Sequence, residues 1–492
     1  MDVDVAIIGS GTAGLAAYRA AKTAGASAAL IEGGEYGTTC ARVGCMPSKL
    51  LIAAAEAVHA AELAPGFGVH PGKVRIDGRE VMARVRSERD RFVGFVLKDV
   101  ERISEVDRFR GHARFEDDHT LIVDDHKRIT AKSIVIATGS RASYPEPLKK
   151  LGERLIINDD VFDWTDLPAS VVVIGPGVIG LEIGQALHRL GVRVAVLGRG
   201  GRVGPIADPD IRAYAIEVLG SEFVLEPDAH VVGMERATPT PSLPLKGREQ
   251  GDGVAIRRKN AAGVEFTEHY DYVLAATGRA PNVDGIGLDK TTIDCDAAGV
   301  PVFDSLTGQT LNGAGATSIF LAGDASNFIP LLHEAADEGR IAGENAARVA
   351  AGKPVLRGLR RAPLGVVFTD PQIAIVGGGW QALEPGRFVV GQASFEDQGR
   401  SRILLKNKGL LHVYGDVATG RLLGAEMIGP AAEHLGHLLA WALQNQMTIS
   451  GMLEMPFYHP VIEEGLRTAL RDLDGKLRSA QAHLKANVTK AA

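Results

Sequence analysis

The sequence predicts an α/β fold with two Rossmann-like βαβ units and a third, C-terminal α+β domain. An apolar strand, a glycine-rich turn and a helix occur in this order twice, near the N-terminus and again near residue 175. After about residue 360 the pattern changes to short strands followed by helices. The length of 492 residues is enough for about three domains of roughly 150 residues each.

The first βαβ unit occupies the N-terminus. An apolar strand over residues 3–8 leads into an alanine-rich helix, and the next apolar run ends at Glu32, 23 residues after Gly9. Glycines in the turn permit a pyrophosphate to approach the helix N-terminus, and an acid at this distance suits a ribose hydroxyl. The alternative is a tight strand–helix turn. The glycines of the G-x-G-x-x-G turn are Gly9, Gly11 and Gly14.

Two of the three cysteines, Cys40 and Cys45, follow this unit directly. Five steps along a regular helix rise about 7.5 Å, which exceeds the Cα separation of roughly 4.4–6.8 Å in a disulfide. A bridge therefore needs an irregular turn at a helix start, which Gly44 and Pro47 can supply. Such a bridge would be strained and easily reduced. The alternatives are a pair of thiols or half of a metal site, and the sequence has no Cys/His cluster to complete such a site.

A helix that runs on from Cys45 places Lys49 four residues later on the same face. A thiolate and an ammonium would then both face the first βαβ unit, whereas a solvated helix lysine is the alternative. Helices over residues 50–105 and short strands at 111–115 and 120–123 follow. The next buried strand ends in Thr138, Gly139 and Ser140.

The second βαβ unit begins with an apolar strand over residues 171–174. At the offset that holds Glu32 in the first unit, the chain has Gly198 followed by Arg199. A guanidinium in place of the acid suits a 2′-phosphate, so the spacing predicts NADPH rather than NADH. The alternative is that Arg199 and Arg202 are exposed surface charges. The turn and helix start of this unit carry Gly175, Gly177, Gly180 and Glu182.

Further strand ends follow the same pattern. Residues 276–278 repeat the Ala-Thr-Gly strand end of residues 137–139, so each unit carries its own copy. A later strand ends in Gly-Asp, and Asp324 suits a hydroxyl-rich ligand chain. Cys295 lies between two aspartates and is expected to be inert. Residues 237–251, rich in proline, are expected to form a flexible surface insertion without a catalytic role.

The C-terminal domain is expected to mix strands and helices. Its predicted strands are 388–393, 402–406 and 410–415, its helices are 431–445 and 461–473, and residues 476–492 are expected to be a loose tail.

Composition narrows the function classes. The net charge of −6 argues against binding to nucleic acid, and no uninterrupted apolar run reaches the length of a membrane span. Three cysteines in a chain of this size indicate a reducing compartment. The acidic N-terminus enters a strand at once, so it is not a signal peptide. A cytoplasmic protein without nucleic-acid or membrane partners is expected.

With these motifs together, residues 1–475 resemble the class I pyridine nucleotide–disulfide oxidoreductases, which are flavoenzymes. The run Cys-x4-Cys-x-Pro-Ser-Lys is closest to the dihydrolipoamide dehydrogenase branch, because the glutathione reductases have two lysines after the proline. Mercuric reductases usually add a C-terminal cysteine pair that this chain lacks. Ala41-Arg42 stands where the family usually has an apolar residue and asparagine.

The resemblance implies three domains. An FAD-binding domain would span 1–148 and 280–355, an NAD(P)-binding domain 149–279, and a dimerisation domain 360–475. FAD would be held by Gly9, Gly11, Gly14, Glu32, Thr39, Lys49, Gly111, Ala113, Thr138, Gly139, Ser140 and Asp324. The nicotinamide cofactor, NAD or NADP, would be held by Gly175, Gly177, Gly180, Glu182, Arg199 and Gly278.

The resemblance also assigns catalytic roles. Cys45 would contact the flavin, Cys40 would exchange with the substrate, and Lys49 would pair with Glu182 beside the flavin. The family's His-Pro-Thr-x-x-Glu run reads His459 to Glu464 here, with valine in place of threonine. This pair would reach across a homodimer into the other subunit's cysteine site.

The expected activity is transfer of two electrons between a nicotinamide and a dithiol or disulfide. A thiol with a pKa of about 8.5 needs a base at neutral pH, and a histidine oriented by a carboxylate suits that task. In the lipoamide direction, His459 deprotonates the dithiol and exchange at Cys40 follows. The alternatives are an NADPH-dependent reductase of another disulfide, a metal ion or a quinone, and a flavin-bearing redox sensor.

Overall fold

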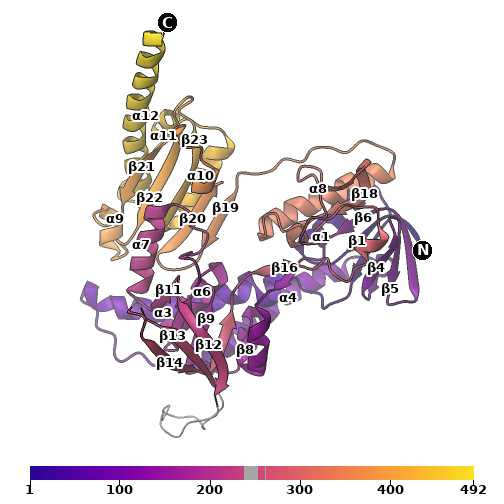
Figure 1. Ribbon diagram of the computed structural model, residues 1–492, viewed down its shortest axis with the longest axis horizontal. Helices are drawn as coiled ribbons and strands as arrows, with labels where there is room; N and C mark the ends of the chain where they lie inside the picture. Colours follow the sequence, from indigo (N-terminus) through magenta and orange to yellow (C-terminus); the bar gives the residue numbers. More distant parts are fainter. Residues whose placement is uncertain (238–252, 261, 492) are drawn as a thin grey trace. The chain divides into compact units, whose positions relative to one another are not determined.

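The computed structural model describes residues 1–237, 253–260 and 262–491, and the chain divides into two compact units (Figure 1). The first unit comprises Met1–Pro47, Arg84–Ser143 and Gly278–Arg360, and the second comprises Ser48–Ala83, Tyr144–Thr277 and Arg361–Ala492. All but the first residue of the predicted 237–251 insertion lies outside the described residues. The residue limits of the three predicted domains stay a prediction.

The first unit is built on an eight-stranded sheet. Its main order is β17-β18-β6-β1-β2-β3, and β4 and β5 extend it from β6 in antiparallel pairing. The central strands are parallel, as in a Rossmann-like unit. The elements are β1 (Asp2–Ile8), α1 (Thr12–Thr23), β2 (Ala28–Glu32), α2 (Thr39–Val43), β3 (Arg108–Arg110), β4 (Ala113–Asp117), β5 (Thr120–Val123), β6 (Lys127–Ile136), β7 (Ser140–Ala142), β16 (Arg279–Pro281), β17 (Gln309–Asn312), β18 (Gly315–Leu321) and α8 (Leu332–Ala350).

Strand β1 shows how the apolar run over residues 3–8 builds this unit. Successive side chains of a strand point to opposite faces. Val5 and Ile7 enter the core that helices α1 and α8 cover, while Ala6 and Ile8 enter the core on the other face of the sheet. Burial on both faces explains why the run is almost continuously apolar rather than alternating.

The second unit holds a five-stranded parallel sheet in the order β11-β10-β9-β15-β8 and the separate antiparallel sheet β12-β13-β14. Helices α3 (Cys45–Leu63) and α4 (Gly78–Glu101) have residues in both units. The other elements are β8 (Leu155–Ile156), α5 (Asn158–Val161), β9 (Ser170–Ile174), α6 (Val178–Arg189), β10 (Arg193–Leu197), α7 (Pro209–Gly220), β11 (Val224–Glu226), β12 (His230–Ala237), β13 (Gly253–Lys259), β14 (Glu265–Tyr270) and β15 (Tyr272–Ala275).

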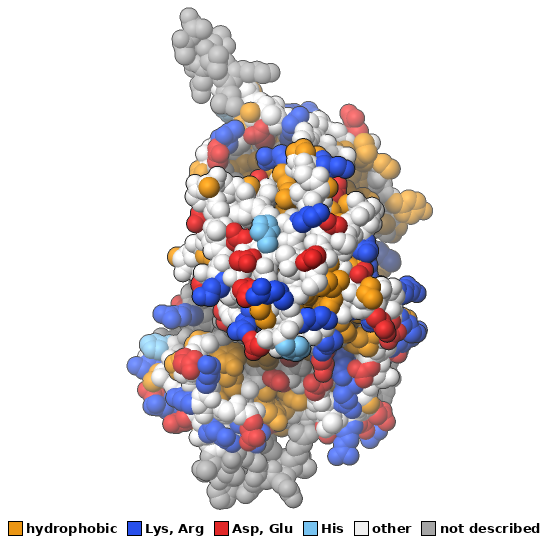
Figure 2. All heavy atoms as spheres, turned by 90° about the vertical axis from the view of Figure 1, so that its right-hand side faces the viewer, with side chains coloured by type: hydrophobic (Ala, Val, Ile, Leu, Met, Phe, Trp, Pro, Cys, Tyr) orange, Lys and Arg blue, Asp and Glu red, His pale blue; other side chains and the backbone are white. Residues whose placement is uncertain are grey.

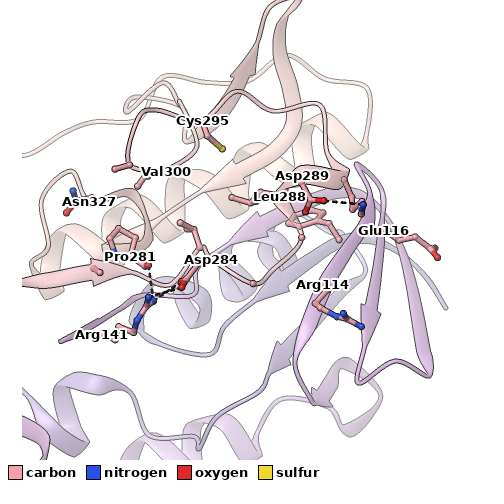
Figure 3. Close-up of a pocket in the computed structure, with 18 of the residues that line it drawn as sticks. Arg114, Glu116, Arg141, Pro281, Asp284, Leu288, Asp289, Cys295, Val300 and Asn327 are labelled. Atoms are coloured by element: carbon pink, nitrogen blue, oxygen red, sulfur yellow. Dashed lines mark hydrogen bonds and ion pairs between the residues drawn. The ribbon is translucent and has the colours of Figure 1, made fainter. Parts of the chain in front are cut away.

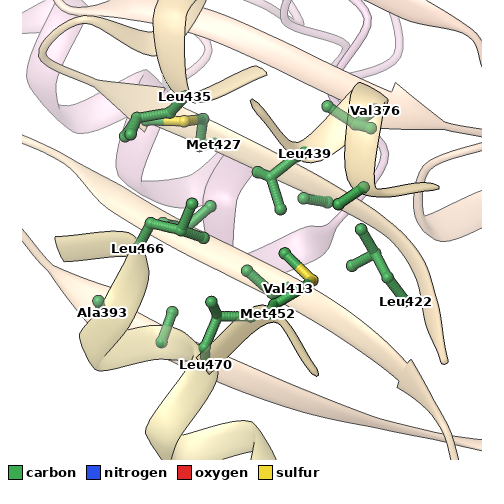
Figure 4. Close-up of a cluster of buried hydrophobic side chains, with 14 of the residues drawn as sticks. Val376, Ala393, Val413, Leu422, Met427, Leu435, Leu439, Met452, Leu466 and Leu470 are labelled. Carbon is green, nitrogen blue, oxygen red and sulfur yellow. The ribbon is translucent and has the colours of Figure 1, made fainter. Parts of the chain in front are cut away.

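The C-terminal part of the second unit is an antiparallel sheet in the order β19-β20-β23-β22-β21, covered by helices α10 and α12. Its core includes Leu435 and Leu439 of α10, Leu466 and Leu470 of α12, and Met427 of the sheet (Figure 4). The elements are β19 (Leu364–Val367), β20 (Gln372–Gly377), β21 (Phe388–Ser394), α9 (Gly399–Ile403), β22 (Leu410–Asp416), β23 (Leu422–Gly429), α10 (Ala432–Gln444), α11 (Ile449–Leu453) and α12 (Glu463–Ala491).

The predicted strand at 402–406 is wrong, because residues 402–403 belong to the short helix α9 and residues 404–405 form a turn. The side chain of Gln398 caps the helix by accepting a hydrogen bond from the Ser401 N–H at 2.7 Å. The buried Ser401 hydroxyl donates to the Phe395 carbonyl at 2.7 Å. These local hydrogen bonds outweigh the strand preference of the isoleucine and leucines that follow.

The predicted loose tail at 476–492 is also wrong, because α12 continues to Ala491. Leu477, beyond the predicted helix end at 473, is buried in the same core as Leu473. Ion pairs at i, i+4 spacing support the extension, and they join Lys476 to Asp472 at 2.7 Å and Arg478 to Asp474 at 2.6 Å.

One helical stretch, Thr39–Phe67, is long and apolar enough to cross a membrane by length and composition alone. From the sequence, no uninterrupted apolar run of that length was expected. A single stretch of this kind is weak evidence for a span, because core helices of other proteins pass the same test. In the described part of the face that Figure 2 draws, basic and acidic side chains are interspersed, in keeping with the small net charge of −6.

A buried polar cluster joins α7 to the C-terminal sheet within the second unit. Asp208 precedes α7, and its Oδ1 accepts hydrogen bonds from the first N–H groups of that helix. Its Oδ2 accepts from the Tyr414 hydroxyl at 2.9 Å and lies 2.8 Å from His412 Nδ1. Burial raises the pKa of Asp208, but the hydrogen bonds from His412 and Tyr414 outweigh burial and hold this pKa below its ordinary value.

Exchange of Asp208 for asparagine is expected to destabilise the protein by about 3 kcal/mol, since it breaks a buried and paired carboxylate. A lowered carboxyl pKa contributes stability above the unfolded-state pKa of about 3.9, and that contribution is lost as pH falls through the lower folded-state pKa. The difference in Tm between the parent and Asp208→Asn should therefore be full near neutrality and shrink below about pH 4. Thermal melts across this pH range measure it, and a difference that grows at low pH would contradict the assignment.

Candidate active site

The first glycine turn has the shape of a cofactor cradle. Strand β1 ends at Ile8, Gly9 has a φ of +105°, and α1 begins at Thr12. A Cβ on Gly14 would lie 1.8 Å from the Gly9 carbonyl oxygen, so the helix start packs directly on the strand end. Larger residues at these two positions would push the backbone apart, and the N–H groups at the helix start would no longer converge on one point.

Glu32 closes one side of this cradle. Its Oε2 accepts hydrogen bonds from the Ser10 N–H at 2.7 Å and the Ser10 hydroxyl at 2.8 Å, and its Oε1 accepts from the Gly34 N–H at 2.7 Å. A carboxylate has about four acceptor positions, so capacity remains for a ribose hydroxyl. Gly111, with a φ of +137°, donates its N–H to the Glu32 carbonyl and leads into β4 at Ala113.

The other side of the cradle is polar. The Thr138 hydroxyl is buried without a hydrogen-bond partner among the residues that the structure describes. The Ser140 hydroxyl donates to Asp324 Oδ2 at 2.7 Å and accepts from Arg279 Nε at 2.8 Å. A buried donor without a partner is costly unless a ligand meets it. The glycine turn, the unmet hydroxyl and the acid together fit the phosphate and hydroxyl groups of FAD.

Arg279 was not among the predicted site residues. It directly follows the Ala-Thr-Gly strand end at 276–278, and its terminal NH2 nitrogen also donates to the Ser140 carbonyl at 2.6 Å. The sequence did contain a signal for Arg279 as a site residue, because a cation beside a glycine turn suits a phosphate.

The two cysteines flank a break between helices in the first unit. Helix α2 is capped by the Thr38 side chain, begins at Thr39 and ends before Gly44, and α3 begins at Cys45. A Cβ on Gly44 would lie 3.2 Å from the Cα of Cys40, so the chain folds back against the first cysteine at this glycine. The predicted irregular turn at a helix start is thus present. The bridge and the redox roles of the two cysteines stay predictions.

Lys49 and Glu182 lie together in the second unit. Lys49 Nζ on α3 donates to Glu182 Oε2 on α6 at 2.7 Å. The N–H of Phe368, directly after β19, donates to Glu182 Oε1 at 2.9 Å. Glu182 is 4% exposed, so both oxygens of a buried carboxylate have charged or polar donors. Phe368 was not among the predicted site residues, because the sequence shows no motif that joins it to Lys49 and Glu182.

The second glycine turn repeats the first. Gly175 has a φ of +109°, and a Cβ on Gly180 would lie 2.0 Å from its carbonyl oxygen. Gly198 stands at the offset that holds Glu32 in the first unit, and the absence of a side chain there has a steric cause. A Cβ on Gly198 would lie 2.6 Å from both Pro176 Cγ and the Pro227 carbonyl oxygen. Arg199 is therefore the first position after β10 at which a long side chain fits, and it is exposed.

His459 and Glu464 also lie together. His459 Nδ1 is 3.1 Å from each carboxylate oxygen of Glu464, and the Val461 N–H donates to Glu464 Oε2 at 3.3 Å. The hydrogen bond from His459 lowers the pKa of Glu464, and the hydrogen bond from Val461 lowers it further. The carboxylate occupies Nδ1, so Nε2 remains for a proton from a substrate. The histidine side chain is 80% exposed, which suits action on a separate molecule.

A cavity of about 1210 Å³ in the first unit is lined by neither Cys40 nor Cys45 (Figure 3). Its charged side chains largely pair with one another, as Arg141 does with Asp284 at 2.8 Å. Cys295 opens on this cavity, where burial and the neighbouring Asp296 and Asp294 raise the pKa of its thiol. A raised pKa lowers the thiolate fraction at neutral pH, which supports the expectation that Cys295 is inert.

The chain matches the family model described as pyridine nucleotide-disulphide oxidoreductase over residues 3–339, and the model of that family's dimerisation domain over residues 364–470. Dihydrolipoyl dehydrogenase 3 of Pseudomonas aeruginosa is 30% identical over 96% of this chain and 98% of its own length. Dihydrolipoyl dehydrogenase of Thermus scotoductus is 32% identical, with coverages of 96% and 97%.

Solved structures share the fold. The Cu(II) complex of the HOCl-induced flavoprotein disulfide reductase RclA from Escherichia coli has a TM-score of 0.76 at 23% identity, covering 96% of this chain and 99% of that one. LpdA from Mycobacterium tuberculosis has a TM-score of 0.76 at 24% identity, with coverages of 95% and 99%.

Proposed function

The chain belongs to the pyridine nucleotide–disulphide oxidoreductases, and from this premise we propose that Cys40 and Cys45 form the redox disulfide that exchanges electrons with a dithiol substrate. The observation that carries the proposal is the helix break at Gly44, which folds the chain back onto Cys40 directly before Cys45. A regular helix would hold the two residues too far apart to bond.

The proposed mechanism assigns each side chain a task. His459 Nε2 accepts a proton from the substrate dithiol, and the Glu464 carboxylate at Nδ1 orients the ring and stabilises its charge. The substrate thiolate attacks Cys40, and the substrate leaves as its disulfide while both cysteines are reduced. FAD, when bound, supplies the two-electron carrier between Cys45 and the nicotinamide. The first cradle would hold its phosphates, and Lys49 with Glu182 would lie beside its ring system.

We propose dihydrolipoamide as the dithiol, which makes the activity that of a dihydrolipoyl dehydrogenase. Relatives with that name match nearly the full length of this chain at about 30% identity. The second candidate is an NADPH-dependent reductase of another disulfide, a metal ion or a quinone. Arg199 favours this candidate because its exposed guanidinium suits a 2′-phosphate.

Steady-state assays of the purified protein separate these candidates. The panel pairs dihydrolipoamide with NAD⁺ or NADP⁺, and pairs NADPH or NADH with glutathione disulfide, cystine, Hg²⁺ or a quinone. The first proposal expects the highest kcat/KM with dihydrolipoamide. Higher values with another acceptor would favour the second candidate, and negligible turnover with all of them would favour a redox sensor.

Exchange of Arg199 for glutamate is expected to lower the preference for NADPH over NADH by roughly ten- to a hundredfold. A lost charge-assisted hydrogen bond to a phosphate costs about 1.5–3 kcal/mol, and repulsion by the new carboxylate adds to it. The ratio of kcat/KM values for the two cofactors measures the change. Arg257→Glu, at an exposed arginine of β13 in the same unit, is the matched control. An unchanged ratio in Arg199→Glu would show that the arginine is only a surface charge.

The dimerisation domain supports a homodimer. Large apolar side chains of this domain are exposed in the single chain, and an interface between subunits would cover them. We propose that His459 and Glu464 act on the cysteines of the other subunit and that the protein is cytoplasmic. The exposed apolar side chains are Leu438, Trp441, Met455 and Tyr458.

A further inference from the structure

Phe368 contacts both members of the Lys49–Glu182 pair. Its N–H donates to Glu182 Oε1 at 2.9 Å, and the Lys49 ammonium lies 4.6 Å from the centre of its ring. The ring is partly buried, and the lysine side chain is 34% exposed. An ammonium over an aromatic face is attracted by the ring quadrupole, and the attraction strengthens as water is excluded.

The backbone around Phe368 is fixed on one face of α6. The Asp370 N–H donates to Gln185 Oε1 at 2.8 Å, and Gln185 Nε2 donates back to the Asp370 carbonyl at 2.8 Å. Arg189 reaches Asp370 Oδ2 at 3.3 Å. Glu182, Gln185 and Arg189 are spaced i, i+3 and i+7, so they lie along the same side of the helix. These contacts set the position of residue 368 along α6.

The hydrogen bond between Lys49 and Glu182 cannot substitute for either contact to Phe368. A lysine side chain has a flexible four-carbon stem, and one hydrogen bond leaves much of its freedom. A buried carboxylate with one donor would leave its second oxygen unmet. The ring restrains the ammonium, and the N–H satisfies the second oxygen of the acid.

We propose that Phe368 is a positioning residue for the reaction, which holds the Lys49 ammonium with its ring and the Glu182 carboxylate with its N–H. Through Phe368, the C-terminal domain thereby positions the Lys49–Glu182 pair of its own subunit, in addition to carrying His459. This inference rests on the proposed function for the place of Lys49 beside the flavin.

The test is competitive acetylation of lysines with trace acetic anhydride, quantified by mass spectrometry on the full chain. Only the uncharged amine reacts, so loss of the ring should raise the rate of Lys49 relative to the exposed Lys408. Phe368→Leu is expected to raise this ratio about two- to fivefold, the change that a cation–π contact at a partly exposed site implies. Phe368→Tyr keeps a ring and should restore the parent ratio.

Phe266→Leu is the matched control. Its ring also lies 4.6 Å from a cation, Arg258, and it is equally half-buried in the same unit. It should leave the Lys49 ratio unchanged. An unchanged ratio in Phe368→Leu, a similar rise in Phe266→Leu, or a failure of Phe368→Tyr to restore the ratio would each overturn the inference. If Phe368→Leu does not fold, Phe368→Met carries the same test.

A second readout follows reduction of the bound flavin by NADPH in a stopped-flow instrument. Phe368→Leu should slow this step at unchanged FAD content, and Phe368→Tyr should restore it. A normal rate in Phe368→Leu would overturn the positioning role. The two proposals fail in different ways. A parent protein without flavin or turnover would refute the proposed function while the acetylation ratios still report the contact. Unchanged ratios in an active enzyme would refute only the role of Phe368.

Discussion

Exchange of Cys45 for serine is expected to lower the turnover rate with dihydrolipoamide by roughly three orders of magnitude or more. A serine hydroxyl cannot form the bond to Cys40 sulfur that receives the substrate's electrons, and the third cysteine, Cys295, lines a cavity whose lining includes neither Cys40 nor Cys45. The flavin should remain bound, because the cradle proposed for it is formed by Gly9, Gly14 and Glu32 and does not include Cys45. NADPH oxidation by ferricyanide, which takes electrons from the flavin directly, should therefore continue.

The matched control is Cys295→Ser. This thiol is exposed, and burial with the neighbouring Asp296 and Asp294 raises its pKa, so it is a poor nucleophile at neutral pH. Its exchange should change neither activity. Dithiol turnover that survives in Cys45→Ser would remove Cys45 from the mechanism. A parallel loss of FAD and of ferricyanide reduction would instead mean that the variant damages the cradle.

Exchange of His459 for alanine is expected to slow dithiol turnover by about 10²- to 10⁴-fold, the usual contribution of a positioned general base. Electron transfer between NADPH and the flavin does not need this proton, so its rate should stay near that of the parent. Because the pKa of Glu464 is lowered by His459, the carboxylate stays ionised below neutrality and continues to orient the ring. Glu464→Gln should slow dithiol turnover less than His459→Ala does. Rates of the two half-reactions, measured separately, check both expectations.

His126→Ala serves as the control, because this exposed histidine lies in a hairpin of the first unit and the one described hydrogen bond of its side chain is to the Asp124 carbonyl. It should leave both half-reactions unchanged. Equal losses in the two half-reactions of His459→Ala would assign this histidine to folding or assembly rather than to proton transfer.

Local sequence patterns were sufficient for the two βαβ units and for helix α3. The first turn could be located because only glycine permits the φ of +105° at Gly9 and the 1.8 Å approach at Gly14. The error at 402–406 arose where the side chains of Gln398 and Ser401 satisfy the backbone and create a helix that apolar periodicity alone does not indicate. The extension of α12 was missed because its buried leucines face a sheet that is distant in the sequence.

The sequence by itself determined the fold class, the two glycine turns, the cysteine pair and the histidine with its acid, because each depends on residues that are neighbours along the chain. Only the tertiary structure decided which distant groups meet. It placed Phe368 on Glu182 and Lys49, brought Arg279 to Ser140, and packed Pro176 and Pro227 against Gly198. Such contacts depend on how separate elements pack, and nothing in the local pattern around any one of these residues carries that information.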